Sequence, residues 1–501
     1  MSKLLIVGAG IAGLSCAIYA QKSGFNVHVY EAGNMPGGNC TAWRRKGYHF
    51  EGGLHWLTGS SPTQMIHRLW QELGAIKSGT EAQQTQIIVN DPFRVCENDG
   101  RQVCLYRDVE KLKAHLIEVS PQDKLQIKKL CRDINRFKKF GMPIMDIFAL
   151  NVSKKAPSIF AAAFKMLPAL LRVPALSKLS VEEYAERFKH PLIRLLMCSV
   201  ADRKFDAVSL LSTLGAASAG DCAYIEGGSL TLVRNMESKF KELGGEVHYG
   251  NRVQAVQVEN GSAKGLLVNG KSISGDCVVV SSDTLAAVDT LFDPPLMDSH
   301  FLRMRENAKK DNALVMCCFV SIGVNIDLSK HPKSVIFNLK KPFEYAGRTI
   351  TSLLYNQYAA TENYAPKGCT AITLILSGNT YHYWKSKKED GTYEACKREL
   401  FEKVINALEE NISGIKSKVA VFDIATPLTF ERYCGTYHGS WMTVRLPKTK
   451  WAILPYKTRL IKDLYFAGQR IIPPGGLPVA VVSGRSAAQH LCRDAGVVFR
   501  S

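Results

Sequence analysis

The feature that most constrains the fold of this chain is a glycine-rich turn within its first 31 residues. A short apolar run, Lys3–Val7, is followed at once by Gly8-Ala9-Gly10-Ile11-Ala12-Gly13, then by a stretch of helical composition, Leu14–Ser23, and a β-rich run, Asn26–Tyr30. This order predicts a buried strand, a tight turn, a helix and a second parallel strand. Such a unit is typical of a doubly wound α/β sheet that holds a dinucleotide pyrophosphate at the helix N-terminus.

Each glycine of this turn, and the acidic residue that follows the second strand, has its own expected role. Gly8 allows the tight turn, Gly10 lets the backbone approach a pyrophosphate, and Gly13 lets the helix pack close to the strands. Glu31 follows Gly13 by 18 residues, directly after the second strand. Its carboxylate is placed there to accept hydrogen bonds from ribose hydroxyls. A glycine-rich turn without a ligand is the alternative, and the complete strand–turn–helix–strand pattern argues against it.

Two later blocks contain further elements of the same kind of fold. Gly227-Gly228-Ser229 opens a predicted helix, Leu230–Leu243, and a buried strand is expected at Asp276–Val280. Near the end, the predicted strand Asp463–Gln469 leads through a Gly/Pro-rich turn into a helix, Val479–Leu491. This second strand–turn–helix arrangement suits another contact with the same anionic ligand. The sequence contains no second G-x-G-x-x-G, so we expect one dedicated dinucleotide site.

The composition is that of a globular protein, and its positive charge is unevenly distributed. The chain has 501 residues, a net charge of +19, and 16 basic against 6 acidic residues between positions 101 and 178. Two helical stretches of this region, Asp123–Phe140 and Ile159–Leu176, combine apolar positions with lysine and arginine. They fit either packed helices with a solvated face or helices that contact an anionic membrane peripherally. We expect no nucleic-acid partner, because only the charge favours one.

The remaining sequence features concern compartment and metal binding. The 14 cysteines are scattered, and none lies in a C-x-x-C pair or at zinc-ligand spacing from histidines. We therefore expect no metal site and a reducing compartment, the cytoplasm.

Ile159–Leu176 is interrupted by charges and prolines, so no spanning helix is predicted. Leu4–Ala20 resembles a signal-peptide core, but its spaced glycines indicate folded structure. Further along, Tyr381–Glu409 is predicted to be one helix.

Together, the three glycine-containing blocks resemble the flavin-binding elements of the phytoene desaturase family. That family includes carotenoid desaturases, carotenoid isomerases and retinol saturases within the flavin amine oxidase superfamily. The blocks are Val7–Glu31 with Gly37-Gly38 and Gly47-Tyr48-His49-Phe50-Glu51-Gly52-Gly53, then Gly227 to Ser281, then Leu464 to Ala488. The resemblance implies an α/β fold with a Rossmann-like FAD-binding domain built from residues 1–75, 222–300 and 451–501. An α+β substrate domain would comprise residues 76–221, facing the membrane, and 301–450.

The resemblance also implies which residues bind FAD. In order along the cofactor they are Gly8, Gly10, Gly13 and Glu31 at the ADP half, Val253 at the adenine, Gly37 and Gly38 at the pyrophosphate and ribityl chain, and Gly468, Gln469, Gly476, Leu477 and Val479 at the ribityl chain and isoalloxazine. Two positions depart from the family pattern. Asn39 stands where arginine is common, and Gln469 stands where aspartate is common; glutamine can still hydrogen-bond a hydroxyl.

The implied activity is an FAD-dependent oxidation, reduction or isomerisation at a carbon–carbon bond of an apolar isoprenoid or polyene substrate. NAD(P)H is a candidate transient electron donor. His55, Arg432 and Tyr433 are the candidate acid/base residues. Two alternatives stay open at this point. One is an amine oxidase or protoporphyrinogen-oxidase-like enzyme, and the other is an escort protein that binds lipidated partners without redox chemistry.

Overall fold

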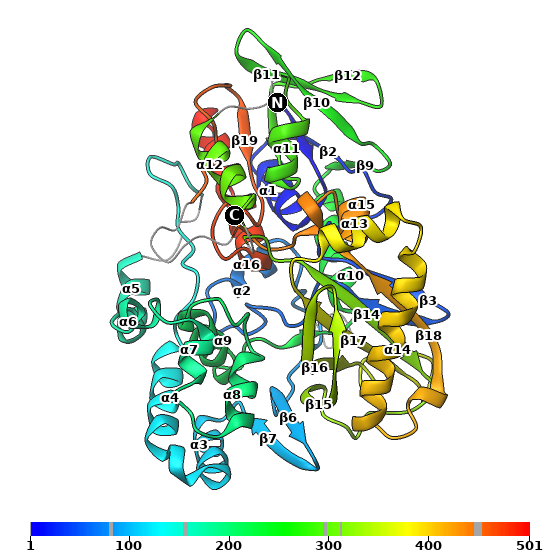
Figure 1. Ribbon diagram of the computed structural model, residues 1–501. Coiled ribbons are helices and arrows are strands. Elements are labelled where there is room, and N and C mark those ends of the chain that lie inside the picture. Colours follow the sequence, from blue (N-terminus) through cyan, green and yellow to red (C-terminus); the bar gives the residue numbers. More distant parts are fainter. Residues whose placement is uncertain (1, 80–83, 154–158, 294–297, 311–312, 445–452) are drawn as a thin grey trace.

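A five-stranded parallel sheet organises the computed structural model, which describes residues 2–79, 84–153, 159–293, 298–310, 313–444 and 453–501 (Figure 1). Its strand order is β19-β13-β1-β2-β9, and all neighbours are parallel. The strands come from three distant parts of the chain: β1 (Lys3–Val7), β2 (Asn26–Tyr30), β9 (Glu246–His248), β13 (Cys277–Val280) and β19 (Leu464–Phe466). β1 and β13 are almost wholly buried, which explains their continuous apolar runs.

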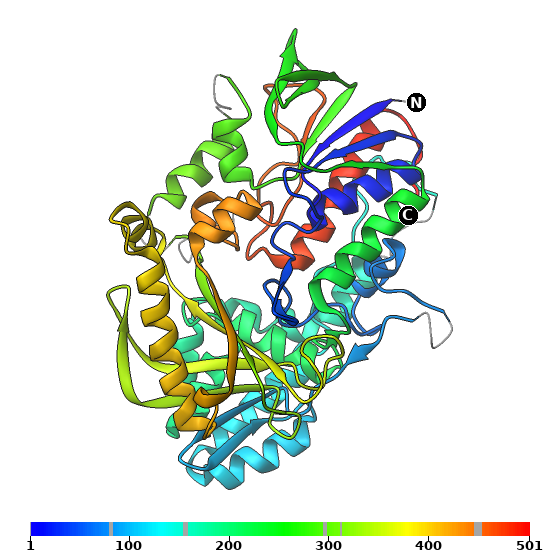
Figure 2. The same cartoon turned by 90° about the vertical axis from the view of Figure 1, so that its right-hand side faces the viewer.

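Both faces of this sheet are covered. One face packs against α1 (Ile11–Lys22), α10 (Gly228–Glu242) and α16 (Gly476–Asp494), which share one apolar core (Figure 2). On the other face lie the antiparallel strands β10 (Val253–Glu259), β11 (Ser262–Val268) and β12 (Lys271–Ser274), with α11 (Thr284–Thr290) and α12 (Ser299–Ala308). This confirms the predicted doubly wound α/β arrangement from three chain segments. α1 and α16 each begin three residues before the predicted start, because each helix includes a glycine of its turn.

A second, seven-stranded sheet lies beside the first. Its order is β18-β14-β17-β16-β15-β6-β7, and its pairs are antiparallel except β15 with β6. The strands are β6 (Arg94–Asn98), β7 (Arg101–Leu105), β14 (Cys317–Val324), β15 (Ser334–Tyr345), β16 (Arg348–Gln357), β17 (Thr370–Ser377) and β18 (Val419–Ala425). The short pairs β3 (Ala42–Arg45) with β4 (Tyr48–Glu51) and β5 (Ile87–Ile88) with β8 (Tyr224–Ile225) complete the described strands.

Two helices pack on the second sheet where the sequence pattern predicts one. α13 (Tyr381–Glu389) and α14 (Tyr393–Asn411) share its core and are separated by a turn at Gly391. The prediction of a continuous helix from Tyr381 to Glu409 is therefore wrong. Gly391 has a φ of +76°, a left-handed conformation that ends a helix and that glycine adopts without strain. α15 (Pro427–Cys434) follows β18 directly.

A helical lobe with its own core occupies the lower part of Figure 1. It contains α3 (Val109–Val119), α4 (Lys124–Phe137), α5 (Ile159–Leu170), α6 (Val173–Leu176), α7 (Val181–Ala185), α8 (Pro191–Cys198) and α9 (Ala207–Ser218), while the short α2 (His67–Glu72) packs near α1. Among the helices of the described residues, none is both long enough and apolar enough to cross a bilayer. The predicted boundary at residues 450–451 lies outside the described residues.

Candidate active site

One large cavity opens at the carboxyl ends of the parallel strands. It has a volume of about 2200 Å³ and is lined by the residues that directly follow the strands, including Gly8 after β1, Glu31 after β2, Ser281 after β13 and Gly468 after β19. Ligands of open α/β sheets bind at this edge. The volume also exceeds the roughly 300–1,000 Å³ of ordinary ligand pockets. The cavity therefore has room for a dinucleotide and a second organic molecule.

The glycines of the first turn take two different places relative to this cavity. Gly8, with a φ of +99°, and Gly10, the N-cap of α1, both line the cavity. Around Gly10, the nearest atom that an added Cβ would meet is the carbonyl oxygen of Gly37, 3.8 Å away. Gly13 is not among the lining residues; an added Cβ there would lie 2.1 Å from the carbonyl oxygen of Gly8. Gly10 leaves space for a ligand, and Gly13 allows close packing.

Glu31 ties the turn after β1 to the end of β2. Its carboxylate accepts a hydrogen bond from the backbone N–H of Ala9 at 2.8 Å and another from Gly33 at 2.7 Å. Both contacts are short and charge-assisted, so they hold the carboxylate in one position at the cavity wall. The sequence pattern predicts the location of this side chain but not its second role as a support of the glycine turn.

The other predicted cofactor residues also line the cavity. They are Gly37 and Gly38 after β2, Val253 at the start of β10, Gly468 and Gln469 after β19, and Gly476, Leu477 and Val479 in the first turn of α16. Neither α1 nor α16 has a side-chain N-cap. Two uncapped helix N-termini thus meet one cavity, which favours a negatively charged ligand there.

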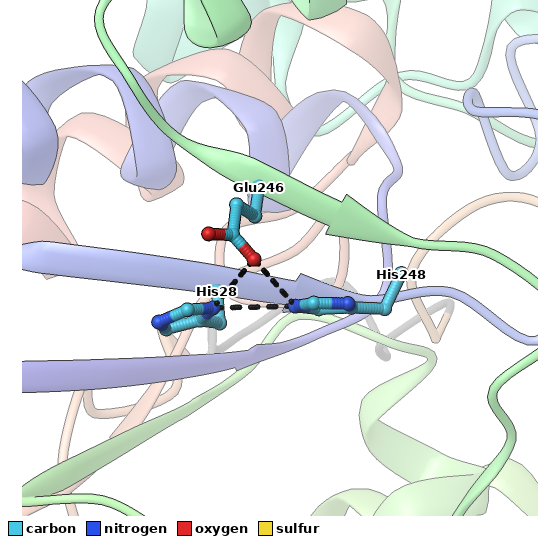
Figure 3. Close-up of side chains that lie close together, drawn as sticks. All are labelled: His28, Glu246 and His248. Carbon is cyan, nitrogen blue, oxygen red and sulfur yellow. Dashed lines mark hydrogen bonds and ion pairs between the residues drawn. The ribbon is translucent and has the colours of Figure 1, made fainter.

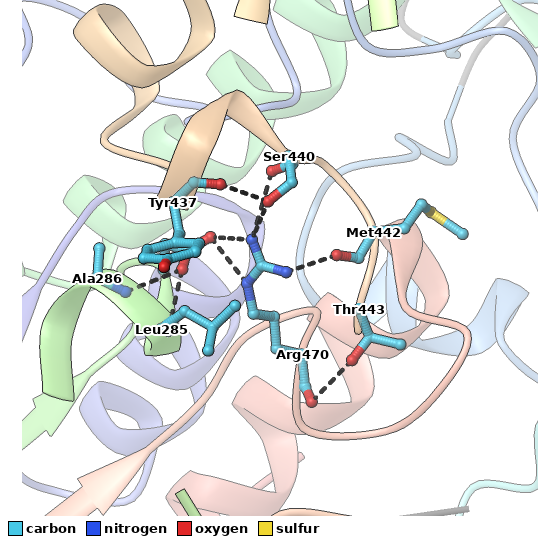
Figure 4. Close-up of polar contacts among 8 residues, drawn as sticks. Leu285, Ala286, Tyr437, Ser440, Met442, Thr443 and Arg470 are labelled. Carbon is cyan, nitrogen blue, oxygen red and sulfur yellow. Dashed lines mark hydrogen bonds and ion pairs between the residues drawn. The ribbon is translucent and has the colours of Figure 1, made fainter. Parts of the chain in front are cut away.

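A buried ion pair fixes the loop between β19 and α16. Arg470 donates to Asp283 through Nε at 2.8 Å, and the two side chains are 1% and 2% exposed. The guanidinium also donates to the carbonyl oxygen of Met442 and to the hydroxyl of Ser440, each at 2.7 Å (Figure 4). Asp283 in turn caps α11 by accepting from the N–H groups of Leu285 and Ala286. Sequence patterns gave no signal for this pair, since its members lie 187 positions apart.

A second buried carboxylate, Glu51, lies at the N-terminus of α10. It accepts hydrogen bonds from the N–H of Ser229 at 3.0 Å and the hydroxyl of Tyr224 at 2.9 Å. Tyr364 completes the group at 3.2 Å. Glu51 belongs to the motif Gly47–Gly53, but these three partners come from two other parts of the chain, around residues 224–229 and at residue 364. It therefore joins β4 to α10 and positions the residues that follow it, up to His55.

His55 faces the cavity from an aromatic wall. Its ring lies 5.9 Å from that of Phe319 and 6.2 Å, edge to face, from that of Trp441. Both ring nitrogens are shielded and have no hydrogen-bond partner among the described residues; the same holds for Trp441 Nε1 and for Asn39 Oδ1. All three residues line the cavity. Buried polar atoms without partners are uncommon in native proteins, and these belong to residues that line one cavity, which favours a polar ligand there.

Burial lowers the pKa of His55 to about 4, so the ring is neutral at pH 7. An unfolded histidine titrates near 6.5, and the unfolded chain therefore binds more protons between these two values. We expect the free energy of unfolding to fall by up to about 3 kcal/mol as the pH drops from 6.5 to 4. Denaturant titrations at several pH values should show a flatter profile for His55→Gln than for the wild type. Equal slopes for the two proteins would contradict this.

Arg432 and Tyr433 lie together on α15 and also line the cavity. Both are exposed, Tyr433 to 69%, and the guanidinium of Arg432 lies 5.2 Å from the centre of the Tyr433 ring. Solvent therefore reaches these side chains, whereas the nitrogens of His55 are shielded. The three predicted acid/base residues therefore line one cavity in different surroundings, His55 half-buried and the other two exposed.

Comparison with known proteins gives a consistent family assignment. The model of the family "Flavin containing amine oxidoreductase" matches residues 11–492. A lycopene-forming phytoene desaturase of Paracoccus sp. is 22% identical over 98% of this chain and 97% of its own length. The chloroplastic prolycopene isomerase of Daucus carota is 22% identical over 99% of this chain and 81% of its own length.

Solved structures agree on the fold. The cyclohexylamine oxidase of Brevibacterium oxydans superimposes with a TM-score of 0.60 at 14% identity, covering 99% of both chains. A putrescine oxidase triple mutant gives a TM-score of 0.63 at 14% identity, covering 98% of this chain and 99% of its own. The resemblance found in the three glycine-containing blocks is thereby confirmed along the whole chain. The protein is a member of the flavin containing amine oxidoreductase family.

Proposed function

We propose that this chain binds FAD along the cavity and transfers hydride to or from a carbon–carbon bond of a long apolar polyene. The observation that carries the proposal is the continuity of one cavity. It runs from the glycine turn of β1 to an apolar wall between the helical lobe and the second sheet, where Val173, Val208, Ile336 and Leu354 line it. The full-length relatives named as a phytoene desaturase and a prolycopene isomerase support this substrate class.

The lining residues would hold FAD in the order that the family resemblance implies. The N-terminus of α1 at Gly10 would hold the pyrophosphate, with Glu31 at the ribose and Val253 at the adenine. Gly37, Gly38 and the first turn of α16 would meet the ribityl chain and isoalloxazine. When bound, the flavin supplies an N5 atom that accepts or donates hydride. The three chain segments around the parallel sheet form the cofactor half of the protein, and residues 76–221 and 301–450 form the substrate half.

The chain's own residues contribute positioning and proton handling in this proposal. An apolar polyene offers few polar groups, so shape and exclusion of water must orient it. The neutral ring of His55, with unpartnered nitrogens at the cavity wall, would donate or accept a proton next to the reacting carbons. Trp441 and Phe319 hold that ring by stacking and edge contacts. Arg432 and Tyr433 stay candidate acid/base residues that line the same cavity.

Glu31 provides the sharpest test of the cofactor position. Glu31→Ala removes the acceptor for both Ala9 and Gly33 and the expected ribose contact, so FAD should dissociate at least about tenfold more readily. Glu31→Gln keeps one acceptor oxygen and should have an intermediate effect. The measurement is the FAD dissociation constant, obtained from the flavin fluorescence released on dilution. Full flavin occupancy and unchanged affinity in Glu31→Ala would remove Glu31 from the ribose site.

The substrate assignment is tested with the purified, flavin-loaded protein under anaerobic conditions. Phytoene or a cis-polyene in lipid dispersion is offered in one arm and putrescine in the other, each with and without NADPH. We expect a polyene product that differs by two hydrogens or by double-bond geometry, identified by chromatography and mass spectrometry. Bleaching of the flavin band by NADPH would favour saturation or isomerisation. Turnover of the amine alone would replace the polyene proposal, and failure to bind FAD would favour the escort alternative.

We further propose that the helical lobe rests on an anionic membrane surface. Phe160 and Phe164 on α5 and Leu171 between α5 and α6 are exposed to between 73% and 84%, and Phe148, earlier in the chain, is 93% exposed. Lys165, Lys178, Lys138 and Lys139 lie in the same stretches of the chain, and Val173 and Ser177 of this region line the cavity. An apolar substrate would then enter from the bilayer through the face that touches it.

Phe160→Ser with Phe164→Ser should weaken binding to phosphatidylserine vesicles at least about tenfold. Co-sedimentation with vesicles, repeated with neutral phosphatidylcholine, measures the effect. Leu460→Ser, which alters an exposed apolar residue outside the lobe, is the matched control. Equal sedimentation of the double variant and the wild type would contradict membrane contact by this surface.

A further inference from the structure

Two histidines and a glutamate meet at the open edge of the parallel sheet, on the neighbouring strands β2 and β9. In the register of β2 and β9, His28 lies opposite Glu246, and Tyr30 lies opposite His248. Alternate residues of a strand share one face, so all four side chains project to the same side. The ring of Tyr30 stacks on that of His248 at a centroid distance of 4.7 Å and fixes its orientation. The edge of the sheet therefore presents a preformed trio.

The three donor atoms form a nearly equilateral triangle (Figure 3). His28 Nδ1 and His248 Nε2 are 3.2 Å apart, and they lie 3.4 Å and 3.5 Å from the same oxygen of Glu246. A tetrahedral ion with bonds of about 2.0–2.1 Å sets its ligand atoms about 3.3–3.4 Å apart. The observed triangle thus has the dimensions of one face of a zinc coordination sphere.

Hydrogen bonds can use only two of the three contacts of this triangle at once. If both rings direct an N–H to the Glu246 oxygen, the two N–H groups also face each other across 3.2 Å without an acceptor. If one ring instead presents its lone pair, that nitrogen has no proton for the carboxylate. A cation at the centre would use all three lone pairs at once. The side chains of His28 and His248 are only 15% and 32% exposed, whereas that of Glu246 is 61% exposed, so the ion would be open to water on one side.

We propose that His28, Glu246 and His248 bind a divalent transition-metal ion, with zinc the best match, and water in the fourth position. Two imidazoles and one carboxylate form a known zinc ligand set, and imidazole favours transition metals over magnesium or calcium. The ion would join β9, from the middle of the chain, to β2, from its beginning. The prediction of no metal site rests on the absence of short zinc-ligand motifs, and such motifs cannot reveal this trio, because His28 lies 218 and 220 positions from Glu246 and His248.

The test uses tag-free full-length protein, stripped with a chelator and dialysed against micromolar Zn²⁺. Metal content by mass spectrometry should be one zinc per chain higher for the wild type than for His248→Ala or His28→Gln. Glu246→Gln should bind zinc at least about tenfold more weakly, since it keeps only the two imidazoles. The control is His300→Ala, because His300 has a single carboxylate neighbour, Asp298 at 3.2 Å; it should retain the wild-type zinc content.

Thermal unfolding supplies a second readout. Zinc should raise the melting temperature of the wild type and of His300→Ala, because an ion that binds only the folded state stabilises it. It should leave His248→Ala unchanged and raise the melting temperature of Glu246→Gln less than that of the wild type. If His28→Gln does not fold, these two variants at more exposed positions decide the question. Equal zinc content in the wild type and both variants, or no zinc retained by the wild type, would overturn the proposal.

Discussion

Replacing Asp283 with alanine is expected to destabilise the protein by about 3–5 kcal/mol. The substitution leaves the guanidinium of Arg470 buried without its counter-ion, and an uncompensated buried charge is far more costly than a lost surface pair. It also removes the N-cap of α11, worth about 1 kcal/mol. Denaturant-induced unfolding, followed by far-UV circular dichroism, measures the change.

Two further variants separate the causes of this effect. Asp283→Asn keeps a cap for α11 but not the charge, so it should recover only the cap contribution. Lys264→Ala breaks an exposed ion pair with Asp463, whose side chains are 44% and 42% exposed, and should cost less than about 1 kcal/mol. A loss below 1 kcal/mol in Asp283→Ala would mean that Arg470 finds another partner or water on relaxation.

Gly13→Ala and Gly10→Ala are expected to fail in different ways. At Gly13 the new methyl group would lie 2.1 Å from the carbonyl oxygen of Gly8 and 2.5 Å from the hydroxyl of Ser281. The helix must move off the strands, which should destabilise the fold by about 3 kcal/mol and abolish flavin binding. At Gly10, φ is −72° and the methyl group enters the cavity. That variant should keep its stability and lose FAD affinity.

The measurements are the free energy of unfolding of the cofactor-free protein and the FAD dissociation constant. A stable Gly13→Ala protein that binds FAD normally would contradict the close-packing role of this glycine. Reduced stability with intact affinity in Gly10→Ala would place the pyrophosphate elsewhere. Both substitutions add one methyl group to the same turn, three positions apart. A difference between the two variants therefore cannot be a general effect of added methyl groups.

The parts of the fold that sequence patterns predicted are those encoded locally. The turn from Gly8 to Gly13 and the Gly/Pro-rich turn between β19 and α16 follow from glycine placement, and both open onto the same cavity. Gly391 shows the limit of periodicity, because one left-handed residue divides an otherwise continuous helical pattern. The pair of Asp283 with Arg470 and the partners of Glu51 lie far apart in sequence. A single aspartate, arginine or glutamate in the sequence does not indicate which distant residue it will contact in the folded protein.

The parallel sheet draws its strands from the beginning, middle and end of the chain, and this order has a consequence for biosynthesis. α1 packs against α16, yet about 465 residues separate their first positions. At roughly 5–20 residues per second, a ribosome needs about 25–100 s to supply the second helix after the first. The apolar face of α1 is therefore uncovered on the nascent chain for that interval. Chaperone capture during translation should limit the yield of folded protein more than the stability of the finished molecule does.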